Sequence, residues 1–553
     1  MLAPDVESVV SHDRLRPILT VSSAGPPATL VTLSEFAAWR WAGPRAVFLR
    51  AASPPNVVAP GPAPDADVAV FPEAEAPVPL THEPVEVVVW PPAEPRDALV
   101  CALWEPTGST IVIVPDHLEC DAIAASGRAQ GRDVRVLRGD LPDAERTRAW
   151  ADARHGACIV VGGRNAVFAP VPDLAAVVVL DDADEALTEE RAPVWHAREI
   201  AARRCQVEGA RLVLVSPAPT VEALELAAGR SVLPPKALAR RGWPRVEVVD
   251  LREEPPGAGL LSRALAPAIQ RALDDGRALV VVNRKGRARL LVCRTCGAVA
   301  ECGRCGARLA EGARLPEGPG VAVCERCAAQ STLQCGHCGS VRFQKLRPGV
   351  TGLRDAIAGL VPNRRVVAVD AASAPVPAFD VAVGTEAVLH RVRGDEDRPV
   401  RLVAFPEIDQ ELLAPRYRAT EQALWLLVRA ARLLGPRDAG GSILVQTRVP
   451  DHDVLRAAQT GDPTAVLAPQ EHRRRELGYP PFGGLAELSG APAAVEAACD
   501  TLRGGLTVLG PSGGRALLRA PTIAVLCDAL AAADLGPARA LGRLRIDVDP
   551  LRV

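Results

Sequence analysis

The 553-residue chain is poor in lysine and has no long apolar run. Lys236, Lys285 and Lys345 are its three lysines, and arginine supplies the other 61 basic side chains. None of the three follows a glycine loop, as the lysine of a phosphate-binding loop would. The absence of eighteen consecutive apolar residues excludes a membrane-spanning helix, and the opening stretch lacks the basic start and apolar core of a secretory signal. The composition therefore predicts a cytoplasmic protein with no membrane segment.

Cysteine, in contrast, is concentrated in one short segment. Eight of the fourteen cysteines form four C-x-x-C pairs: Cys293/Cys296, Cys302/Cys305, Cys324/Cys327 and Cys335/Cys338. In a chain without secretory features, repeated pairs at this spacing indicate zinc binding in preference to disulfides or a single redox pair. Since four thiolates complete a tetrahedral site, the sequence predicts two Zn²⁺ ions per chain.

Loop lengths indicate which pairs share an ion. Five residues separate Cys296 from Cys302, whereas eighteen separate Cys305 from Cys324, a spacer typical of zinc ribbons. The prediction is a nested arrangement with two groups of ligands: Cys302, Cys305, Cys324 and Cys327 on one ion, and Cys293, Cys296, Cys335 and Cys338 on the other. Sequential pairing along the chain is the alternative.

Short apolar runs alternate with helix-like segments through most of the remaining chain. Five such runs lie within residues 85–216 and five more within residues 278–447, a pattern typical of buried strands in parallel sheets. This predicts an α/β fold with two parallel-sheet lobes, the cysteine segment being inserted after the first strand of the second lobe. Prolines before the lobes indicate a linker, and a small α+β domain is expected after residue 452.

The charge of the chain is unevenly distributed. The net charge is −2, yet residues 284–354 carry thirteen Lys and Arg against four Asp and Glu. Eight thiolates and two Zn²⁺ ions would still leave about +5 on this segment. A basic module in a near-neutral chain predicts contact with a nucleic-acid backbone, although arginine is abundant everywhere and a solvated surface is the alternative.

Further motifs carry a family resemblance. "VVNRKGRARLLVC" precedes the cysteine pairs, and "VGGRNAVFAP", "RAPVWHAREIA", "ILVQTRVPDH", "RRRELGYPPF" and "IDVDP" occur elsewhere in the chain. With these motifs and its eight cysteines, the chain resembles the PriA family of replication-restart primosomal proteins from about residue 85 to the C-terminus. The resemblance implies two RecA-like lobes, binding of branched or forked DNA, and support for reloading of the replicative helicase.

The resemblance also implies partners, a location and domain limits. The partners are primosome proteins, the replicative helicase loader and single-strand-binding protein, at the nucleoid in the cytoplasm. The start of the chain resembles only the second half of the family's N-terminal domain, which recognises the 3′ end of a DNA strand. The expected divisions are a partial N-terminal DNA-binding domain (1–55), a proline-rich linker (56–84), lobe 1 (85–235), the start of lobe 2 (236–290), the zinc module (291–345), the remainder of lobe 2 (346–452) and a C-terminal domain (453–553).

The nucleotide-binding motifs depart from the family pattern. "PPAEPRD" at 91–97 stands where a phosphate-binding loop is expected, and its prolines offer no backbone N–H. "DDAD" at 181–184 replaces the family's DEEH. Leu433 and Pro436 stand at the arginine-finger positions, while the spacing of Arg429 and Arg432 predicts that they point elsewhere on the helix.

These departures predict a fork-binding protein that is not an enzyme, with no catalytic residue and no nucleotide cofactor. Two alternatives stand beside this prediction. One is an active ATP-dependent 3′–5′ DNA helicase, and the other is a protein-docking factor that uses the zinc module and contacts DNA only weakly.

Overall fold

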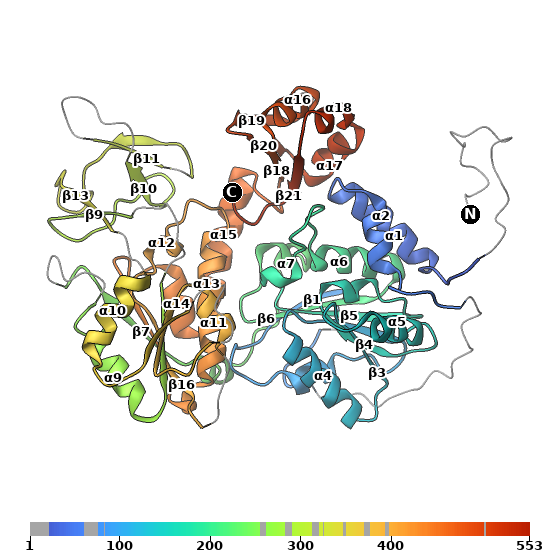
Figure 1. Ribbon diagram of the computed structural model, residues 1–553, viewed down its shortest axis with the longest axis horizontal. Helices are drawn as coiled ribbons and strands as arrows, with labels where there is room; N and C mark the ends of the chain where they lie inside the picture. The colour runs from blue at the N-terminus through green and yellow to red at the C-terminus, as the bar shows by residue number, and fades with distance from the viewer. Residues whose placement is uncertain are drawn as a thin grey trace.

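The structure is a computed structural model that describes residues 21–59, 76–81, 83–254, 261–282, 290–311, 320–324, 326–346, 350–369, 376–392, 397–502 and 505–553. Two α/β lobes lie side by side, with the cysteine-rich module above the second lobe and a small C-terminal domain above the first (Figure 1). No helix in these described ranges is long and apolar enough to cross a membrane.

Lobe 1 is built on a six-stranded parallel sheet in the order β1-β6-β5-β2-β4-β3. Its strands read as continuous apolar runs because both faces are buried: Val177 and Val179 join one hydrophobic cluster, and Val178 joins another. The strands are β1 Val85–Val89, β2 Ser109–Ile113, β3 Val134–Leu137, β4 Ile159–Gly162, β5 Leu174–Leu180 and β6 Arg211–Ser216. The helices are α3 Asp97–Ala102, α4 His117–Ala129, α5 Asp143–Asp152, η2 Arg164–Phe168, η3 Glu185–Leu187, α6 Ala197–Glu208, α7 Val221–Leu226 and α8 Lys236–Arg241.

Lobe 2 repeats this architecture with a parallel sheet in the order β14-β15-β8-β16-β17-β7. The strands are β7 Arg245–Asp250, β8 Arg277–Val281, β14 Val366–Val369, β15 Val381–Gly384, β16 Val400–Phe405 and β17 Ser442–Thr447. The helices are α9 Leu265–Asp275, α10 Val350–Leu360, α11 Ala387–Arg391, α12 Asp409–Leu412, α13 Ala419–Leu434, η4 Arg437–Ala439, α14 Asp453–Thr460 and α15 Thr464–Leu477. The edge strand β7 is an addition to the predicted set, and its alternating charged and apolar residues are only half buried.

The cysteine-rich module is inserted between β8 and β14 and consists of short antiparallel strands. It has a three-stranded sheet, β10-β11-β12, and a pair formed by β9 and β13. These strands are β9 Leu290–Cys293, β10 Leu309–Glu311, β11 Val321–Cys324, β12 Gln330–Thr332 and β13 Phe343–Leu346. The fold class predicted from sequence, two parallel-sheet lobes with an inserted module and a small C-terminal domain, is confirmed.

The C-terminal domain is a four-stranded antiparallel sheet in the order β19-β20-β18-β21, with helices on one side. Its elements are β18 Gly484–Gly490, α16 Pro492–Leu502, β19 Thr507–Ser512, β20 Arg515–Ala520, α17 Ile523–Ala532, α18 Gly536–Ala540 and β21 Leu544–Val548.

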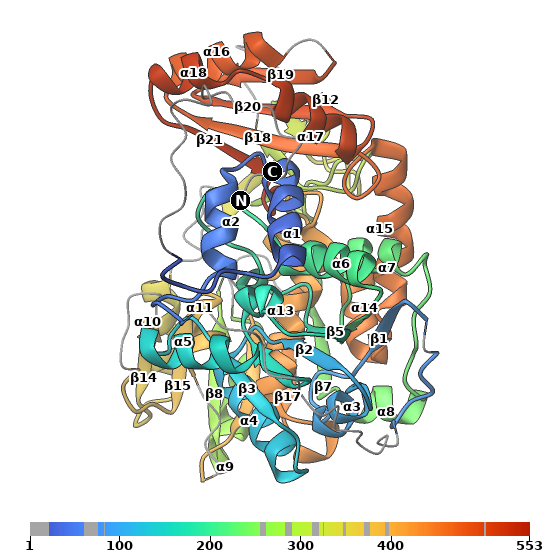
Figure 2. The ribbon, with the colours of Figure 1, turned by 90° about the vertical axis from the view of Figure 1, so that its right-hand side faces the viewer.

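Two N-terminal helices, α1 (Ala28–Arg40) and α2 (Arg45–Ala52), lie between lobe 1 and the C-terminal domain (Figure 2). Phe48 packs edge-on against Trp195 of lobe 1, while the indole N–H of Trp39 donates to Asp528 of α17 at 2.8 Å. One hydrophobic cluster therefore runs through these helices, lobe 1 and the C-terminal sheet. The first twenty residues of the expected N-terminal DNA-binding domain, and residues 60–75 of the expected linker, lie outside the described residues, and that domain stays a prediction.

Candidate metal centres and the cleft between the lobes

Each of the four C-x-x-C pairs folds into the same tight turn. In every turn, the amide of the fourth residue after the first cysteine donates to that cysteine's carbonyl oxygen at 2.8–2.9 Å. The donors are Gly297, Gly306, Ala328 and Gly339, with φ angles of 75°, 69°, 56° and 71°. Three of these left-handed positions are glycine, which adopts such angles without strain, and Ala328 is the exception. The repeated turn aims both thiols of each pair to the same side.

The turns assemble into two clusters of four sulfur atoms. The inner cluster contains Cys302, Cys305, Cys324 and Cys327, and the outer cluster contains Cys293, Cys296, Cys335 and Cys338. Within each cluster all Sγ atoms lie within 4.8 Å of one another. These are the two groups that the nested arrangement predicts, and the sequential alternative is excluded.

The geometry of both clusters fits a tetrahedral ion. Zn–S bonds of about 2.3 Å would place tetrahedral sulfurs about 3.8 Å apart. The observed Sγ–Sγ distances between facing pairs are 3.4 and 3.6 Å in the inner cluster and 3.5 and 3.6 Å in the outer one. All eight cysteines are free thiols, so none is committed to a disulfide. The clusters can therefore hold metal ions, one in each.

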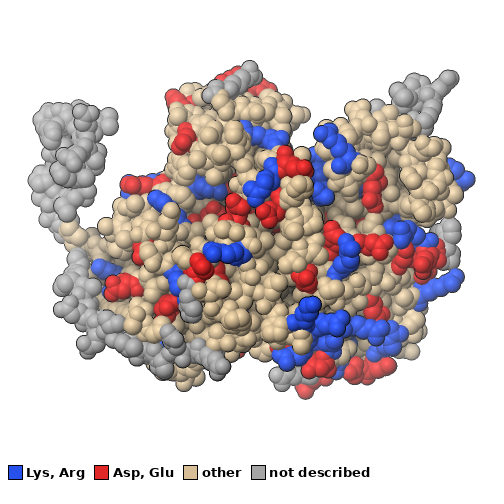
Figure 3. Space-filling view, turned by 180° about the vertical axis from the view of Figure 1, so that it is seen from behind, with Lys and Arg blue, Asp and Glu red and all other residues tan. Residues whose placement is uncertain are grey.

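The basic character of the module is only partly visible. Arg294, Arg304 and Arg342 are exposed on it, whereas the run at 284–289 lies outside the described residues. On the face shown in Figure 3, acidic and basic side chains are intermixed, and the largest gathering of basic residues lies over lobe 2 at the lower right.

A cleft of about 760 Å³ separates the two lobes at the position where the sequence departs from the family's nucleotide motifs. Residues of both lobes line it, among them Pro91, Pro92, Pro95, Arg96 and Asp184 from lobe 1 and Glu386, Arg429, Arg432 and Leu433 from lobe 2. The departures noted in the sequence therefore meet at one place.

Asp181 bridges the lobes beside this cleft. Its carboxylate accepts a hydrogen bond from Arg96 of lobe 1 at 2.8 Å and from Arg432 of α13 at 2.7 Å. Burial alone would raise the pKa of Asp181, but the Arg432 and Arg96 guanidiniums outweigh it and hold the pKa below its usual range. Arg96 also pairs with Glu119 of α4, and this second contact holds the Arg96 side chain in place beside Asp181.

Arg429 forms a second bridge one helical turn before Arg432. It lies 3.3 Å from the Asp184 carboxylate of lobe 1 and pairs with Glu386 of lobe 2. The expectation that Arg429 and Arg432 point away from the cleft is therefore wrong. With positions three apart on a helix facing the same side, α13 presents both guanidiniums to the acidic residues of "DDAD".

Asp182 and His196 have a structural role within lobe 1. The buried Asp182 carboxylate accepts hydrogen bonds from Thr220 and, at 3.2 Å, from Arg198. His196 caps the N-terminus of α6 by accepting the Arg198 amide at its Nδ1, and its Nε2 lies 3.1 Å from the Asp182 carbonyl oxygen. Burial, reinforced by nearby arginines, lowers the pKa of His196 well below its usual value, so the ring is neutral at pH 7.

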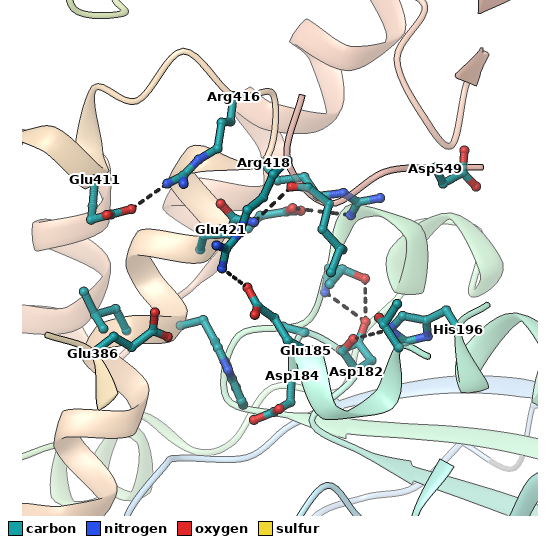
Figure 4. A pocket seen from close by; sticks show the side chains of 18 of the residues that line it. Asp182, Asp184, Glu185, His196, Glu386, Glu411, Arg416, Arg418, Glu421 and Asp549 are labelled. Atoms are coloured by element: carbon teal, nitrogen blue, oxygen red, sulfur yellow. Dashed lines mark hydrogen bonds and ion pairs between the residues drawn. The ribbon is translucent and has the colours of Figure 1, made fainter. Parts of the chain in front are cut away.

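A third set of charged residues joins lobe 1, lobe 2 and α15. Glu222 of α7 pairs with Arg418 at 2.6 Å and with Arg474 of α15 at 3.0 Å, and Arg474 also pairs with Glu421 of α13. A second cavity lies between the lobes, distinct from the cleft described above. Figure 4 shows Arg418 and Glu421 in this cavity, facing Asp182 and His196. The four side chains of this network are each more than nine-tenths buried: Glu222, Arg418, Glu421 and Arg474. The network is therefore part of the contact between the lobes and not a solvated surface.

None of these network residues was predicted from sequence. Arg418, Glu421, Trp425, Arg429 and Arg432 recur at intervals of three or four, and such spacing places them on one helical face. That periodicity was the available signal for a charged helix face. It does not identify Glu222 or Asp181 as partners, because these lie about 200 to 250 residues earlier in the chain.

Comparison with known proteins shows which proteins the chain is similar to. Residues 475–551 match the family described as the primosomal protein N C-terminal domain. A probable replication restart protein PriA of Mycobacterium bovis is 31% identical over 417 residues, which is 71% of this chain and 62% of that protein. The chain is similar to PriA proteins over this region. A PriA protein of Treponema pallidum is 29% identical over 64% of the chain and 55% of its own length, so this chain spans about three fifths of these PriA relatives.

Solved structures share the arrangement of the lobes only distantly. RecG bound to a three-way DNA junction gives a TM-score of 0.36 at 10% identity, over 71% of this chain and 46% of RecG. A DEAD box protein from Methanococcus jannaschii gives 0.30 at 12% identity, over 68% of this chain and 86% of that protein.

The prediction that the chain is not an enzyme is wrong. Its PriA relatives form a helicase-like enzyme family, and the comparisons give no sign that activity has been lost. One of the three grounds for that prediction fails in the structure, since Arg429 and Arg432 reach the inter-lobe cleft. The replaced loop at 91–97 is a real difference from the family, but it does not exclude the family's activity.

Proposed function

We propose that this PriA relative binds abandoned or stalled replication forks and supports reloading of the replicative helicase. The observation that carries the proposal is 31% identity to PriA across 71% of the chain, with the primosomal C-terminal domain at residues 475–551. The two helicase-like lobes and the inserted cysteine module supply the matching architecture.

The metal centres are proposed as two structural Zn²⁺ sites. Cys302, Cys305, Cys324 and Cys327 would hold the inner ion, and Cys293, Cys296, Cys335 and Cys338 the outer ion. Four thiolates at these separations suit Zn²⁺, which prefers tetrahedral sulfur coordination in closed sites. The module has a small core of its own that includes Cys302 and Cys324, so the inner ion would contribute directly to its folding.

By the same relationship, the partners are proposed to be primosome proteins, the replicative helicase loader and single-strand-binding protein, at the nucleoid in the cytoplasm. The domain limits given under Sequence analysis are proposed with it.

Binding of forked DNA tests the proposal. Fluorescence anisotropy with a labelled fork, a labelled duplex of equal length and the purified chain would measure affinity from 50 to 300 mM salt. We expect tighter binding to the fork, and a log affinity that falls linearly with log salt by about 0.9 for each duplex phosphate contacted. Equal affinity for fork and duplex, or no dependence on salt, would contradict the proposed function.

A further inference from the structure

A cavity of about 400 Å³ lies between the cysteine-rich module and lobe 2, outside the inter-lobe cleft. Its walls include the turn around Cys305, the segment after β17 that begins at Arg448, and Arg473 on α15. The volume is in the range of sites that hold small ligands or parts of larger ones.

Arg448 is buried in this cavity without adequate partners. Its side chain is 8% exposed, and its Nε and one terminal nitrogen make no hydrogen bond to any described residue. The nearest carboxylate, Asp409, is 3.6 Å from the guanidinium and already accepts hydrogen bonds from Thr447 and from the Arg448 backbone amide. Arg448 therefore places a weakly paired positive charge in the wall of the cavity.

Two more guanidiniums face the same cavity. Arg326 bonds only to backbone carbonyls, those of Cys305, Ala414 and Arg416, and its Nε has no partner among the described residues. Its charge is therefore not balanced by a carboxylate in direct contact. Arg473 is half buried and has no ion pair with a described residue.

The acidic residues that line the cavity are partly engaged elsewhere. Asp453 pairs with Arg456 on its own helix. Glu301 and Asp451 lie on the side of Arg252, which itself forms a two-point contact with Asp250. Four arginines therefore line the cavity against three carboxylates, and two of these arginines, Arg326 and Arg473, have no carboxylate in direct contact among the described residues.

The first turn of α13 reaches the cavity next to these arginines. Thr420 lines it, and Arg418, at the N-cap of this 16-residue helix, gives no side-chain cap. The same first turn carries Glu421, which pairs with Arg474 and offsets the positive potential of the helix start, so the arginine side chains and not the helix supply the positive charge of the cavity.

We propose that this cavity binds a phosphate group of a DNA strand that passes between the cysteine-rich module and lobe 2. The proposal rests on the proposed function, since a fork-binding protein presents single strands to this surface. Arginine is suited to the role because its planar fork matches two phosphate oxygens at once. The same cavity could accept free phosphate, so the test must separate the two sources.

The test is an Arg473→Gln variant, because Arg473 has no ion-pair partner to leave unpaired and the variant should fold normally. Anisotropy with a labelled single-stranded oligonucleotide would give the slope of log affinity against log salt. Losing one phosphate contact should reduce that slope by about 0.7 and weaken binding about fourfold at 0.15 M salt, if affinities converge at 1 M. Arg473→Lys should keep most of the slope, since it keeps the charge.

Arg245→Gln is the matched control. It removes the same charge from lobe 2 at the start of β7, whereas the cavity lies beyond the other end of that strand, and Arg245 is 72% exposed. Arg245→Gln should leave the slope unchanged. Arg448→Gln should weaken binding at least as much as Arg473→Gln, with thermal melting used to compare only variants that remain folded.

Titration of inorganic phosphate against chloride at equal ionic strength separates the sources. The proposal is supported if phosphate competes with the oligonucleotide for wild type but not for Arg473→Gln. It is overturned if Arg473→Gln keeps the wild-type salt slope while the fork is still bound, an outcome that leaves the proposed function intact. It is also overturned if phosphate stabilises wild type alone while oligonucleotide binding is unaffected by the variant, since the site would then serve free phosphate. Failure of wild type to bind any DNA would refute the proposed function itself.

Discussion

Replacing Asp181 by asparagine would test whether a buried ionic bridge joins the two lobes. The Asp181 carboxylate is fully buried and is shared by Arg96 of lobe 1 and Arg432 of lobe 2. Asparagine keeps the shape but removes the negative charge that both guanidiniums contact. Breaking a buried pair typically costs about 3–5 kcal/mol. Because Arg96 keeps Glu119 as a second partner, we expect D181N to lower the free energy of unfolding by about 3 kcal/mol, the lower end of that range.

Arg432→Gln is the matched change from the other lobe. The Arg432 side chain is 27% exposed, and its loss leaves Asp181 still paired with Arg96, so no buried charge becomes isolated. We expect R432Q to cost roughly 1.5 kcal/mol, the low end for a hydrogen bond to a charged group. The double variant should cost less than the sum of the two, because both changes remove the same contact.

The assay combines urea unfolding with hydrogen exchange of β5 and α13. Since the folded pKa of Asp181 is depressed, its stabilising effect is complete above the unfolded value of about 3.9 and is lost as the pH falls below it. D181N should therefore flatten the acid side of the stability curve below about pH 4 and speed exchange in both elements. Losses below about 0.5 kcal/mol in both single variants, or an unchanged acid limb, would refute the bridge.

Three further predictions concern the metal centres and His196. Metal analysis should find two Zn²⁺ per chain, and Cys302→Ser should lose the inner ion and keep the outer one; one ion in the wild type would contradict this. Ala328→Gly should stabilise the module by about 0.5–1 kcal/mol, because φ is 56° at this position and glycine adopts that angle without strain. Gly306→Ala, at a φ of 69°, should destabilise the module by about 1 kcal/mol or more. Resistance of the bound metal to a chelator measures both effects, and equal responses would show that the turns are not strained. His196 has a depressed folded pKa, so its effect on stability is neutral above the unfolded value of about 6.5 and unfavourable as the pH falls below it. His196→Asn keeps a capping acceptor and should remove the loss of stability between about pH 6.5 and 5. Thermal melting at each pH measures this, and an unaltered pH profile would mean that His196 is not the group responsible.

The parts of the fold predicted from sequence are those with strong local signals. Buried parallel strands such as β5 and β6 are apolar throughout, so their positions are visible without a partner. The order of strands within each sheet depends on long-range packing and could not be predicted. The edge strand β7 was missed because its exposed charges interrupt the apolar pattern.

The cysteine clusters were predictable because ligand type and spacing are both local properties. The cleft between the lobes was not, because its contacts join residues that are distant in sequence. Arg432 was judged from its offset to a family motif, whereas its direction is fixed by the face of α13 that packs against lobe 1. A single helical position decides such a contact, and only the assembled lobes determine which position faces Asp181.

The position of lobe 2 in the chain limits how the molecule can open. Lobe 1, the two N-terminal helices and the C-terminal sheet share one hydrophobic cluster, and the Arg40–Asp549 pair ties the start of this body to its end. In the sequence, lobe 2 lies between lobe 1 and the C-terminal sheet. The chain therefore connects lobe 2 to this body at two points, near α8 before lobe 2 and through α15 after it. Two chain connections restrict the movement of lobe 2 relative to this body. They favour a hinge rotation about the line between the connections over a translation away from it. A change in the separation of the lobes would carry the cysteine-rich module with lobe 2, because the Arg308 amide and the Arg326 side chain of the module donate to backbone carbonyls of that lobe.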